Sequence, residues 1–288
     1  MLMDMKELLE TAYKNEFAIG AFNVANSEFA KAVIQGAEAQ HAPAIIQIHP
    51  LEIALMGDAF VAYLREAINK THVPMALHLD HGGSVADVMR AIRNGYNSVM
   101  IDASHLNFED NIALTAKVVE IAHSVGVAVE AELGTIGSNE GSGEGGADEI
   151  LYTDPDQAKE FVERTGIDLL AVAIGTSHGI YPETKDHKIR VDLLKQIKEK
   201  VPVPMVLHGG SDNKDAEISA ASQNGIAKIN LASDMKKAFY DALRKQLVEH
   251  SDQYESFQVM PNATNAAQAI VEQKITLFGS SGKADLYK

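Results

Sequence analysis

A short β-rich apolar run, in most cases followed by a segment of helical periodicity, recurs eight times along this chain of 288 residues. The runs are nearly continuously apolar rather than alternating, as is typical of parallel strands whose two faces are both covered. Intervening stretches such as SEFAKAVIQGAEAQ (27–40) and DQAKEFVERTG (156–166) have the spacing of amphipathic helices. The predicted strands cover residues 17–24, 42–48, 73–80, 97–102, 127–133, 168–175, 203–209 and 226–231.

Eight strand–helix units in a chain of this length predict a closed (β/α)8 barrel, the α/β fold also called the TIM barrel. A doubly wound open sheet is the alternative, but the Gly-x-Gly-x-x-Gly loop that often follows its first strand is missing. The hydrophobic content of 46% supports a substantial core, and no low-complexity linker divides the chain. We therefore expect one (β/α)8 domain that covers residues 1–288.

The composition argues against several classes of partner. A net charge of −15 would repel a nucleic-acid backbone or an anionic membrane surface. The chain has no cysteine, which excludes disulfides and thiolate metal sites. No apolar run approaches the roughly 18 residues that span a bilayer, and the acidic start MLMDMKELLE differs from a signal peptide. We expect a cytoplasmic protein with no nucleic-acid or membrane partner.

The longest interruption of the strand–helix rhythm is the glycine-rich, acidic stretch GTIGSNEGSGEGGADE (134–149), between the fifth predicted strand and the next helix. A flexible loop in this place is typical of an active-site lid. The final stretch ITLFGSSGKADLYK (275–288) follows an amphipathic run and is interpreted as a tail.

Polar residues lie at the ends of all eight predicted strands. In a (β/α)8 barrel the chemistry is found at the carboxyl ends of the strands, where the loops converge. Taken alone, each of these residues is compatible with a hydrogen-bonded loop residue or with the N-cap of the next helix. The set is Asn23, His49, Asp80 with His81, Asp102, Glu132, His178 just beyond its strand, His208 and Asn230.

Three histidines in this set, His81, His178 and His208, are expected to share one rim of the barrel. With no cysteine available, three converging imidazoles are the ligand set of a Zn²⁺ ion with positions left open for substrate, and hence of a catalytic metal. His78 lies inside its strand on the same side as Asp80, so we expect it to line the barrel beside the metal ligands. The remaining histidines are expected in solvent, at positions 41, 72, 105, 123, 187 and 250.

The motifs HLDHGG, VMIDASH, VEAELG, AVAIGTSHG, LHGGS and KINLASD, in this order, resemble those of class II, metal-dependent fructose-bisphosphate and tagatose-bisphosphate aldolases. The resemblance extends from AIGAFNV to the closing LFGSSGKA. It implies a (β/α)8 lyase of carbohydrate metabolism and glycolysis that forms a homodimer or homotetramer. It also implies reversible cleavage of a ketose (bis)phosphate, through an enediolate, into dihydroxyacetone phosphate and glyceraldehyde 3-phosphate or a related aldehyde.

The resemblance assigns roles to individual residues. It implies that His81, His178 and His208 hold the catalytic zinc ion and that Asp80 is the acid/base for the C4 hydroxyl. Eight residues beyond Glu132, Glu140 matches the glutamate that takes the proton from the dihydroxyacetone phosphate carbon, with Glu144 as its rival on the same loop.

Further positions match binding sites of the family. Asp102 and Glu132 match an acidic pair associated with a second divalent metal in some members. The pocket for the dihydroxyacetone phosphate end corresponds to Gly179, Gly209, Ser211, Asn230 and Ser233, and Asn23 and His49 are additional candidates for substrate binding. Some members also bind a monovalent cation, Na⁺ or K⁺, through backbone carbonyls near the two glycines.

Three departures from the family pattern concern the substrate. His49 stands where fructose-bisphosphate members carry serine or threonine, Asp212 follows Ser211 where many relatives have glycine, and Pro182 stands where some members have lysine. A carboxylate beside a phosphate pocket is unfavourable unless it points away or binds a cation. The identity of the aldehyde and the presence of a second, distal phosphate are therefore left open.

Three alternative functions are compatible with histidines at the rim of a barrel. A metal-dependent hydrolase on the same barrel usually has a His-x-His pair on its first strand, and residues 17–24 contain none. A class I aldolase needs a lysine that points into the barrel, for which Lys228 is the one candidate on a predicted strand. A non-catalytic or regulatory metal-binding subunit is the third alternative, and a cleavage assay on metal-loaded protein separates it from an enzyme.

Overall fold

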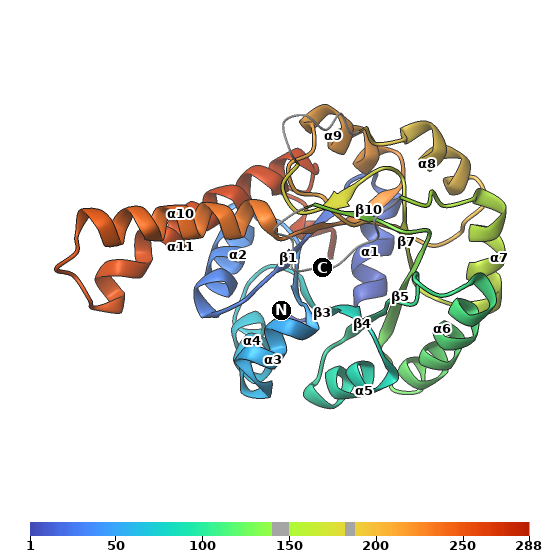
Figure 1. Ribbon diagram of the computed structural model, residues 1–288, viewed down its shortest axis with the longest axis horizontal. Coiled ribbons are helices and arrows are strands. Elements are labelled where there is room, and N and C mark those ends of the chain that lie inside the picture. The colour runs from blue at the N-terminus through green and yellow to red at the C-terminus, as the bar shows by residue number, and fades with distance from the viewer. Residues whose placement is uncertain (140–149, 182–187, 288) are drawn as a thin grey trace.

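The computed structural model describes residues 1–139, 150–181 and 188–287. Eight parallel strands close into a barrel and helices cover its outside (Figure 1), which confirms the predicted (β/α)8 fold. The strands follow one another around the wall in chain order, and the last pairs with the first. The wall consists of β1 (Ile19–Asn23), β2 (Ala44–Ile48), β3 (Met75–Gly82), β4 (Ser98–Ile101), β5 (Ala128–Leu133), β7 (Leu169–Val172), β9 (Met205–Leu207) and β10 (Ile226–Leu231).

Several helices begin where the sequence supplies an N-cap side chain. Asn26, Ser84, Asn107 and Asp154 each accept hydrogen bonds from backbone N–H groups of the first turn that follows. The helices are α1 (Met5–Lys14), α2 (Ser27–Ala39), α3 (Pro50–Met56), α4 (Asp58–Asn69), α5 (Val85–Asn94), α6 (Phe108–His123), α7 (Pro155–Thr165), α8 (Val191–Lys198), α9 (Asp215–Gln223), α10 (Ser233–Glu249), α11 (Ser256–Leu277) and the 3₁₀ turn η1 (Ala284–Tyr287).

Helix α1 closes the barrel at the end where the strands begin. Its buried residues Met5, Leu8, Leu9 and Ala12 have the i, i+3, i+4, i+7 spacing of one helix face. They pack against apolar side chains from the first halves of the strands, among them Ile19, Ala76, Ala128 and Leu169. Burial of one leucine in such a cluster contributes about 1.5–3 kcal/mol. The polar rim therefore lies at the opposite, open end.

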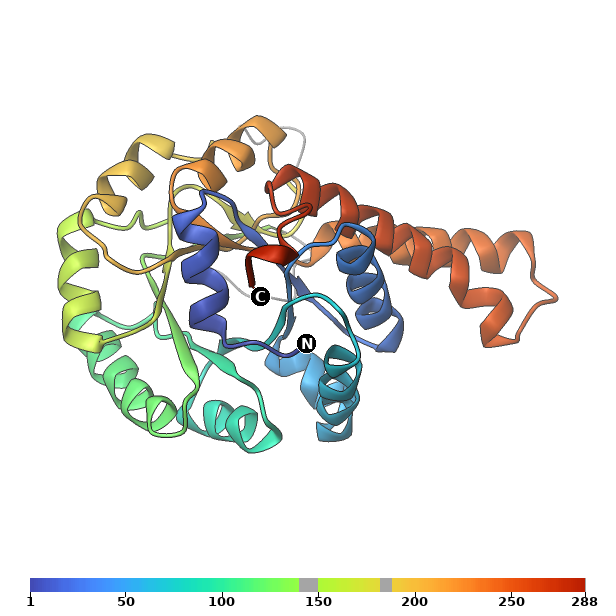
Figure 2. The same ribbon diagram turned by 180° about the vertical axis from the view of Figure 1, so that it is seen from behind.

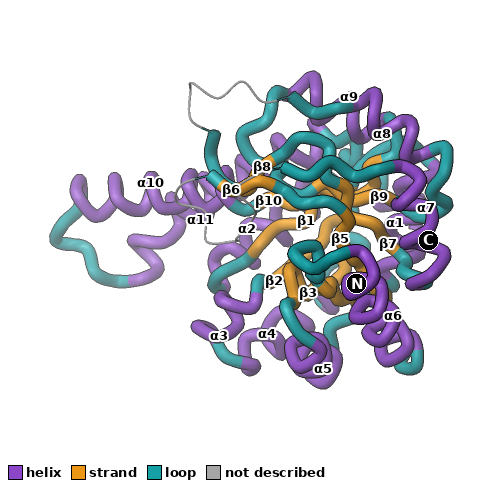
Figure 3. Tube along the Cα trace, turned by 45° about the vertical axis from the view of Figure 1, so that its right-hand side comes forward, coloured by secondary structure: helices purple, strands orange, loops and turns teal. Residues whose placement is uncertain are grey.

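A second, two-stranded sheet lies at this open end. β6 (Gly137–Ser138) pairs in parallel with β8 (Ser177–His178), and the backbone N–H of Asn139 donates to the carbonyl of His178 at 2.9 Å. Figure 3 shows this small sheet beside the barrel strands. The stretch predicted as a lid thus starts hydrogen-bonded to the segment that carries His178.

Helices α10 and α11 form a long hairpin that projects away from the barrel (Figures 1 and 2). The barrel-side part of α11 packs on α2, where a Cβ on Gly36 would lie 2.8 Å from Val271. Of residues 275–288, interpreted as a tail, 275–277 belong to the end of α11, and the buried Tyr287 donates from its hydroxyl to the carbonyl of Leu8. Among the described residues, no helix combines the length and apolar character needed to cross a membrane.

Candidate active site

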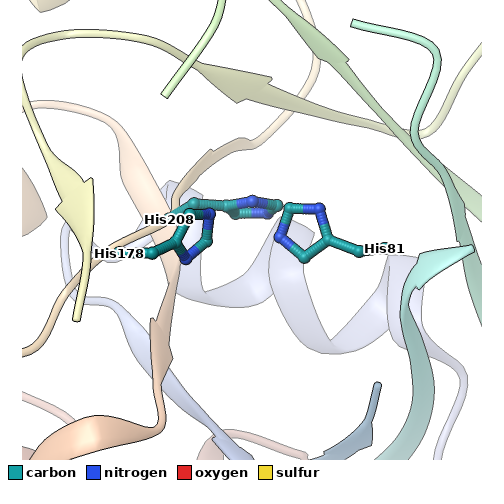
Figure 4. A group of neighbouring side chains, drawn as sticks. All are labelled: His81, His178 and His208. Carbon is teal, nitrogen blue, oxygen red and sulfur yellow. The ribbon is translucent and has the colours of Figure 1, made fainter. Parts of the chain in front are cut away.

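Three imidazole rings meet at the open end of the barrel. His81 belongs to β3, His178 to β8, and His208 directly follows β9. The ring centroid of His81 lies 5.1 Å from that of His178 and 4.6 Å from that of His208. The three rings are turned toward one another (Figure 4), and each offers a nitrogen within 4.8 Å of the others. The structure brings together the three residues that the sequence placed at one rim.

A β-bulge explains how His81 and Asp80 both face the centre. Side chains alternate along a regular strand, so two consecutive residues point to opposite faces. The register of β3 against β4 shifts between Leu79 and Gly82, and His81 has a φ of 46°, in the left-handed region that is uncommon for residues other than glycine. The bulge turns the imidazole back toward the barrel axis beside the carboxylate.

The hydrogen bonds of two rings fit a bound metal ion. His81 Nδ1 donates to Asp102 Oδ2 at 2.7 Å, and His208 Nε2 donates to Glu130 Oε1 at 2.8 Å. The other nitrogens, His81 Nε2 and His208 Nδ1, are buried and face the site, where Glu132 Oε2 lies 3.3 Å from His208 Nδ1. Metal-binding histidines typically donate their second N–H to a carboxylate, which leaves the lone pair of the first nitrogen free for the metal. These residues therefore fit a catalytic zinc ion.

The surrounding carboxylates shift the pKa values of both imidazoles. Burial alone would lower the pKa of His81, but Asp80 and Asp102 outweigh it and raise the pKa to about 10. Burial also opposes the charged form of His208, yet its contacts with Glu130 and Glu132 raise its pKa. The cluster of carboxylates thus favours positive charge at this point, whether it is carried by protons or by a metal cation.

Asp80 lies between two asparagine amides. Asn23 Nδ2 donates to Asp80 Oδ2 at 2.7 Å and Asn230 Nδ2 donates to Asp80 Oδ1 at 3.0 Å. Burial would raise the pKa of Asp80, but the positive charges of His81 and His208 and the donated hydrogen bonds hold it well below its usual range. The group is a fixed carboxylate, and the two asparagines predicted to bind substrate are its hydrogen-bond partners.

Asp102 and Glu132 form a second acidic group with His81, again with ligand atoms within 4.8 Å of one another. Asp102 Oδ1 accepts from the backbone N–H and the hydroxyl of Ser104, while its other oxygen holds the imidazole. Glu132 Oε2 is buried and lies 3.3 Å from His208 Nδ1. The predicted pair is therefore brought together beside the three histidines.

The predicted phosphate-binding residues lie near the start of α10. Ser233 is the first residue of this helix, and the hydroxyl of the buried Ser211 accepts from the backbone N–H of Asp234 at 3.4 Å. Gly209 has a φ of 64°, and a Cβ there would lie 2.5 Å from the carbonyl oxygen of Ser177. Gly179 also has a positive φ, 92°. Only glycine adopts both conformations without strain.

Two departures from the family pattern can be placed. The carboxylate of Asp212 accepts from the backbone N–H of Tyr181 at 2.8 Å. His49 is the N-cap of α3, where its Nδ1 accepts from the Leu51 N–H, and its ring centroid lies 6.2 Å from that of His81. Glu140, Glu144 and Pro182, which the sequence also singled out, lie outside the described residues, as does His187.

The sequence did not point to a charged group inside the barrel. Glu130 and Lys228, fully buried, form an ion pair of 2.9 Å directly beneath His208. His78 lines the barrel as expected, with Nδ1 2.8 Å from Ser98 Oγ, and burial together with Lys228 lowers its pKa to about 3. The sequence does contain a signal for the ion pair, because Glu130 and Lys228 each interrupt an otherwise apolar strand. The remaining described histidines are exposed, as predicted, at positions 41, 72, 105, 123 and 250.

Comparison with known proteins agrees with this geometry. The family model for fructose-bisphosphate aldolase class-II matches residues 3–283. The probable fructose-bisphosphate aldolase of Bacillus subtilis (strain 168) is 40% identical over 288 residues, covering 98% of this chain and 99% of the relative. The fructose-bisphosphate aldolase of Geobacillus stearothermophilus is 39% identical over 290 residues with the same coverage.

A solved structure is also similar along its whole length. The X-ray crystal structure of the YdjI aldolase from Escherichia coli K12 matches with a TM-score of 0.87 and 38% identity, covering 99% of this chain and 100% of that chain. The chain therefore belongs to the class II fructose-bisphosphate aldolase family of metal-dependent lyases.

Proposed function

We propose that His81, His178 and His208 hold the catalytic zinc ion of this aldolase and that Asp80 is its acid/base. The observation that carries the assignment is that two buried nitrogens, His81 Nε2 and His208 Nδ1, are turned toward one space with His178 and lie beside the carboxylate of Glu132. When bound, the ion acts as a Lewis acid that stabilises negative charge developing on the substrate's oxygens.

Asp80 handles the proton of the substrate's C4 hydroxyl. As the C3–C4 bond breaks, this hydroxyl becomes a carbonyl and its proton must pass to a base within hydrogen-bond reach. The carboxylate is ionised and fixed by Asn23 and Asn230, so it needs no reorientation to accept the proton. In the reverse reaction it returns the proton to the aldehyde oxygen as the new bond forms.

Glu140 exchanges the proton at the dihydroxyacetone phosphate carbon, with Glu144 as the alternative. Support comes from its neighbour, since the backbone N–H of Asn139 donates to the carbonyl of His178. This bond ties the start of the glycine-rich stretch to a proposed zinc ligand. The residue that precedes Glu140 in the chain is thus held at the edge of the site.

The N-terminus of α10 binds the phosphate of the dihydroxyacetone phosphate half. Backbone N–H groups at a helix N-terminus favour anions, and here they are joined by the hydroxyls of Ser211 and Ser233 and by the close turns at Gly179 and Gly209. Asp212 does not oppose this assignment, because its carboxylate is already engaged by the N–H of Tyr181.

The substrate is a ketose 1,6-bisphosphate or a closely related ketose phosphate, and the second product is glyceraldehyde 3-phosphate or a related aldehyde. His49, whose ring lies 6.2 Å from that of His81, borders the site where the aldehyde half must extend. A second divalent ion at Asp102 and Glu132 and a monovalent cation near Gly179 and Gly209 belong to the same proposal.

The assembly and location of the enzyme are further parts of the proposal. We expect a single (β/α)8 domain over residues 1–288 in a cytoplasmic homodimer or homotetramer. Support for self-association comes from the end of the α10–α11 hairpin, where Val248, Tyr254 and Phe257 are 75–87% exposed. A cluster of exposed apolar side chains on a projecting element is typical of a protein interface.

A cleavage assay tests the proposed chemistry. Zinc-loaded protein should release dihydroxyacetone phosphate from fructose 1,6-bisphosphate, tagatose 1,6-bisphosphate or a ketose 1-phosphate, and a chelator should abolish the release. His208→Ala should lose bound zinc and turnover together. Retained turnover in this variant would contradict the ligand assignment, and absence of cleavage of every ketose phosphate would favour a non-catalytic metal-binding subunit.

A further inference from the structure

The interior of the barrel has a polar middle layer that the proposed chemistry does not use. The lower layer, against α1, is apolar, and the rim carries the site. Between them lie polar side chains without exposed surface: Gln47, His78, Ser98, Glu130 and Lys228. Neighbouring strands place these residues next to one another, since Gln47 is opposite His78 and His78 is opposite Ser98.

Glu130 is the residue of this layer that reaches the proposed zinc site. One oxygen, Oε1, accepts from His208 Nε2 at 2.8 Å. The other, Oε2, accepts from Lys228 Nζ at 2.9 Å and lies 3.5 Å from His78 Nε2. Both oxygens thus face cationic or N–H groups, and the carboxylate is held in one orientation from both sides.

This arrangement determines which nitrogen of His208 faces the site. An ionised carboxylate only accepts hydrogen bonds, so the nitrogen next to Glu130 must carry the proton. Nε2 therefore keeps its proton when a metal is bound, and Nδ1, on the side of the open end, is the nitrogen that can give up its proton to a metal. The Lys228 ammonium is a donor only, so it holds Glu130 as the acceptor in this network.

Stability is a weak explanation for such a pair. The cost of removing two charges from water often exceeds the attraction between them, and well-packed apolar residues in their place are often neutral or stabilising. A buried pair that touches a metal ligand has a second explanation, because partners of metal-binding histidines fix the tautomer and orientation of the ring.

We propose that Glu130 is a positioning residue that fixes the ring and tautomer of His208 and so sets the metal affinity of the site, while Lys228 balances the buried charge of Glu130. The inference rests on the proposed role of His208 as a metal ligand. Glu130 acts through the imidazole and not on the substrate, and Lys228 offsets the cost of burying the carboxylate.

Two double variants test the role of the acceptor at position 130. Glu130→Met with Lys228→Met removes both charges together, so no unpaired buried charge is left behind. Glu130→Gln with Lys228→Met removes the same charges but keeps a carbonyl oxygen that can accept from His208 Nε2. The two proteins differ mainly in this one hydrogen bond, and urea unfolding of the metal-free proteins establishes that both are folded.

Zinc affinity, measured by competition with a chromophoric chelator, is the main measurement. The Met/Met variant should bind zinc about 10- to 100-fold more weakly than the wild type, and the Gln/Met variant should recover most of the loss. The visible spectrum of the cobalt-substituted proteins should change in the first variant and resemble the wild type in the second. Unchanged zinc affinity and cobalt spectrum in a folded Met/Met variant would overturn the proposal, as would an equal loss of zinc affinity in both variants.

His208→Ala, measured in parallel, separates this failure from that of the proposed function. Wild-type zinc affinity in His208→Ala would refute the ligand assignment itself. Weak binding by His208→Ala together with normal binding by the Met/Met variant would refute only the positioning role.

Discussion

Replacement of Asp80 by asparagine should disable one half-reaction and leave the other in place. The substitution removes the carboxylate that accepts the proton of the C4 hydroxyl, while the three histidines proposed to hold zinc are unchanged. Loss of a positioned general base lowers turnover by about 10²–10⁴-fold. Proton exchange at the dihydroxyacetone phosphate carbon, assigned to Glu140, should continue in the same variant.

The structure also predicts a cost in stability. Both oxygens of Asp80 accept hydrogen bonds from amide groups, those of Asn23 and Asn230. An asparagine at this position must turn its NH₂ group toward one of these donors, which leaves a buried polar group unpaired at a cost of about 1–3 kcal/mol. For a chain of this length that cost corresponds to roughly 2–5 °C in Tm.

The assay compares Asp80→Asn with Asp58→Asn, the same chemical change at a half-exposed residue of α4. Ketose phosphate cleavage, dihydroxyacetone phosphate proton exchange, zinc content and Tm are measured for both. The control should change each quantity little. Cleavage at the wild-type rate in Asp80→Asn would refute the acid/base role, and joint loss of exchange and bound zinc would show that the residue maintains the metal site instead.

Three further perturbations follow from the geometry. Gly82→Ala should weaken zinc binding at least tenfold, because its Cβ would lie 2.6 Å from the Met100 carbonyl and displace the bulge at His81. Gly83→Ala is the control and should bind zinc normally, because no atom lies closer than 4.0 Å to its Cβ. Equal zinc affinities of the two variants, measured by chelator competition, would contradict this prediction. The pKa of His81 is raised to about 10, so zinc must displace a proton at neutral pH and its apparent affinity should rise about tenfold per pH unit from 6 to 8. Calorimetry in buffers of different ionisation enthalpy should find at least one proton released per zinc ion bound. Zinc binding that does not depend on pH would contradict this prediction. Leu8→Ala, in the apolar cluster under the barrel, should lower the free energy of unfolding by about 2–5 kcal/mol in urea titrations. The control Leu55→Ala, at an exposed position, should change the free energy of unfolding little. Equal effects of the two substitutions would refute the stabilising role of α1 packed against the barrel.

The barrel and its rim could be predicted because both depend on local patterns. Continuous apolar runs such as APAIIQI and DLLAVAIG are typical of buried parallel strands, and the carboxyl ends of such strands meet at one edge. That rule predicts that His81, His178 and His208 share one rim of the barrel.

Other features depend on contacts that no local pattern encodes. Strict alternation would turn His81 away from the barrel interior next to an inward Asp80, and only the bulge in β3 brings both to the centre. The pair β6 and β8 has two residues in each strand, too few for periodicity to detect. The segment from 275 onward was interpreted as a tail, but its docking depends on hydrogen bonds with Leu8 of α1 and with Ala18, far away in the chain.

The ion pair in the polar middle layer of the barrel could be predicted only in part. Glu130 and Lys228 stand in apolar strands, VAVEAEL and IAKINL, where an unpaired charge would be costly. Each charge could have been recognised as needing a partner, although none was predicted from the sequence. The sequence did not indicate which partner, because β5 and β10 are not neighbours in the wall and meet only across the barrel interior.

The most direct test of the metal-dependent chemistry is exchange of the carbon-bound proton of dihydroxyacetone phosphate in D₂O, followed by NMR with and without a chelator. The measurement requires no knowledge of the aldehyde and depends on the zinc site and the near phosphate site alone. The account predicts exchange in zinc-loaded protein that a chelator abolishes and added zinc restores. Exchange that persists without metal, or no exchange in folded, zinc-loaded protein, would contradict it.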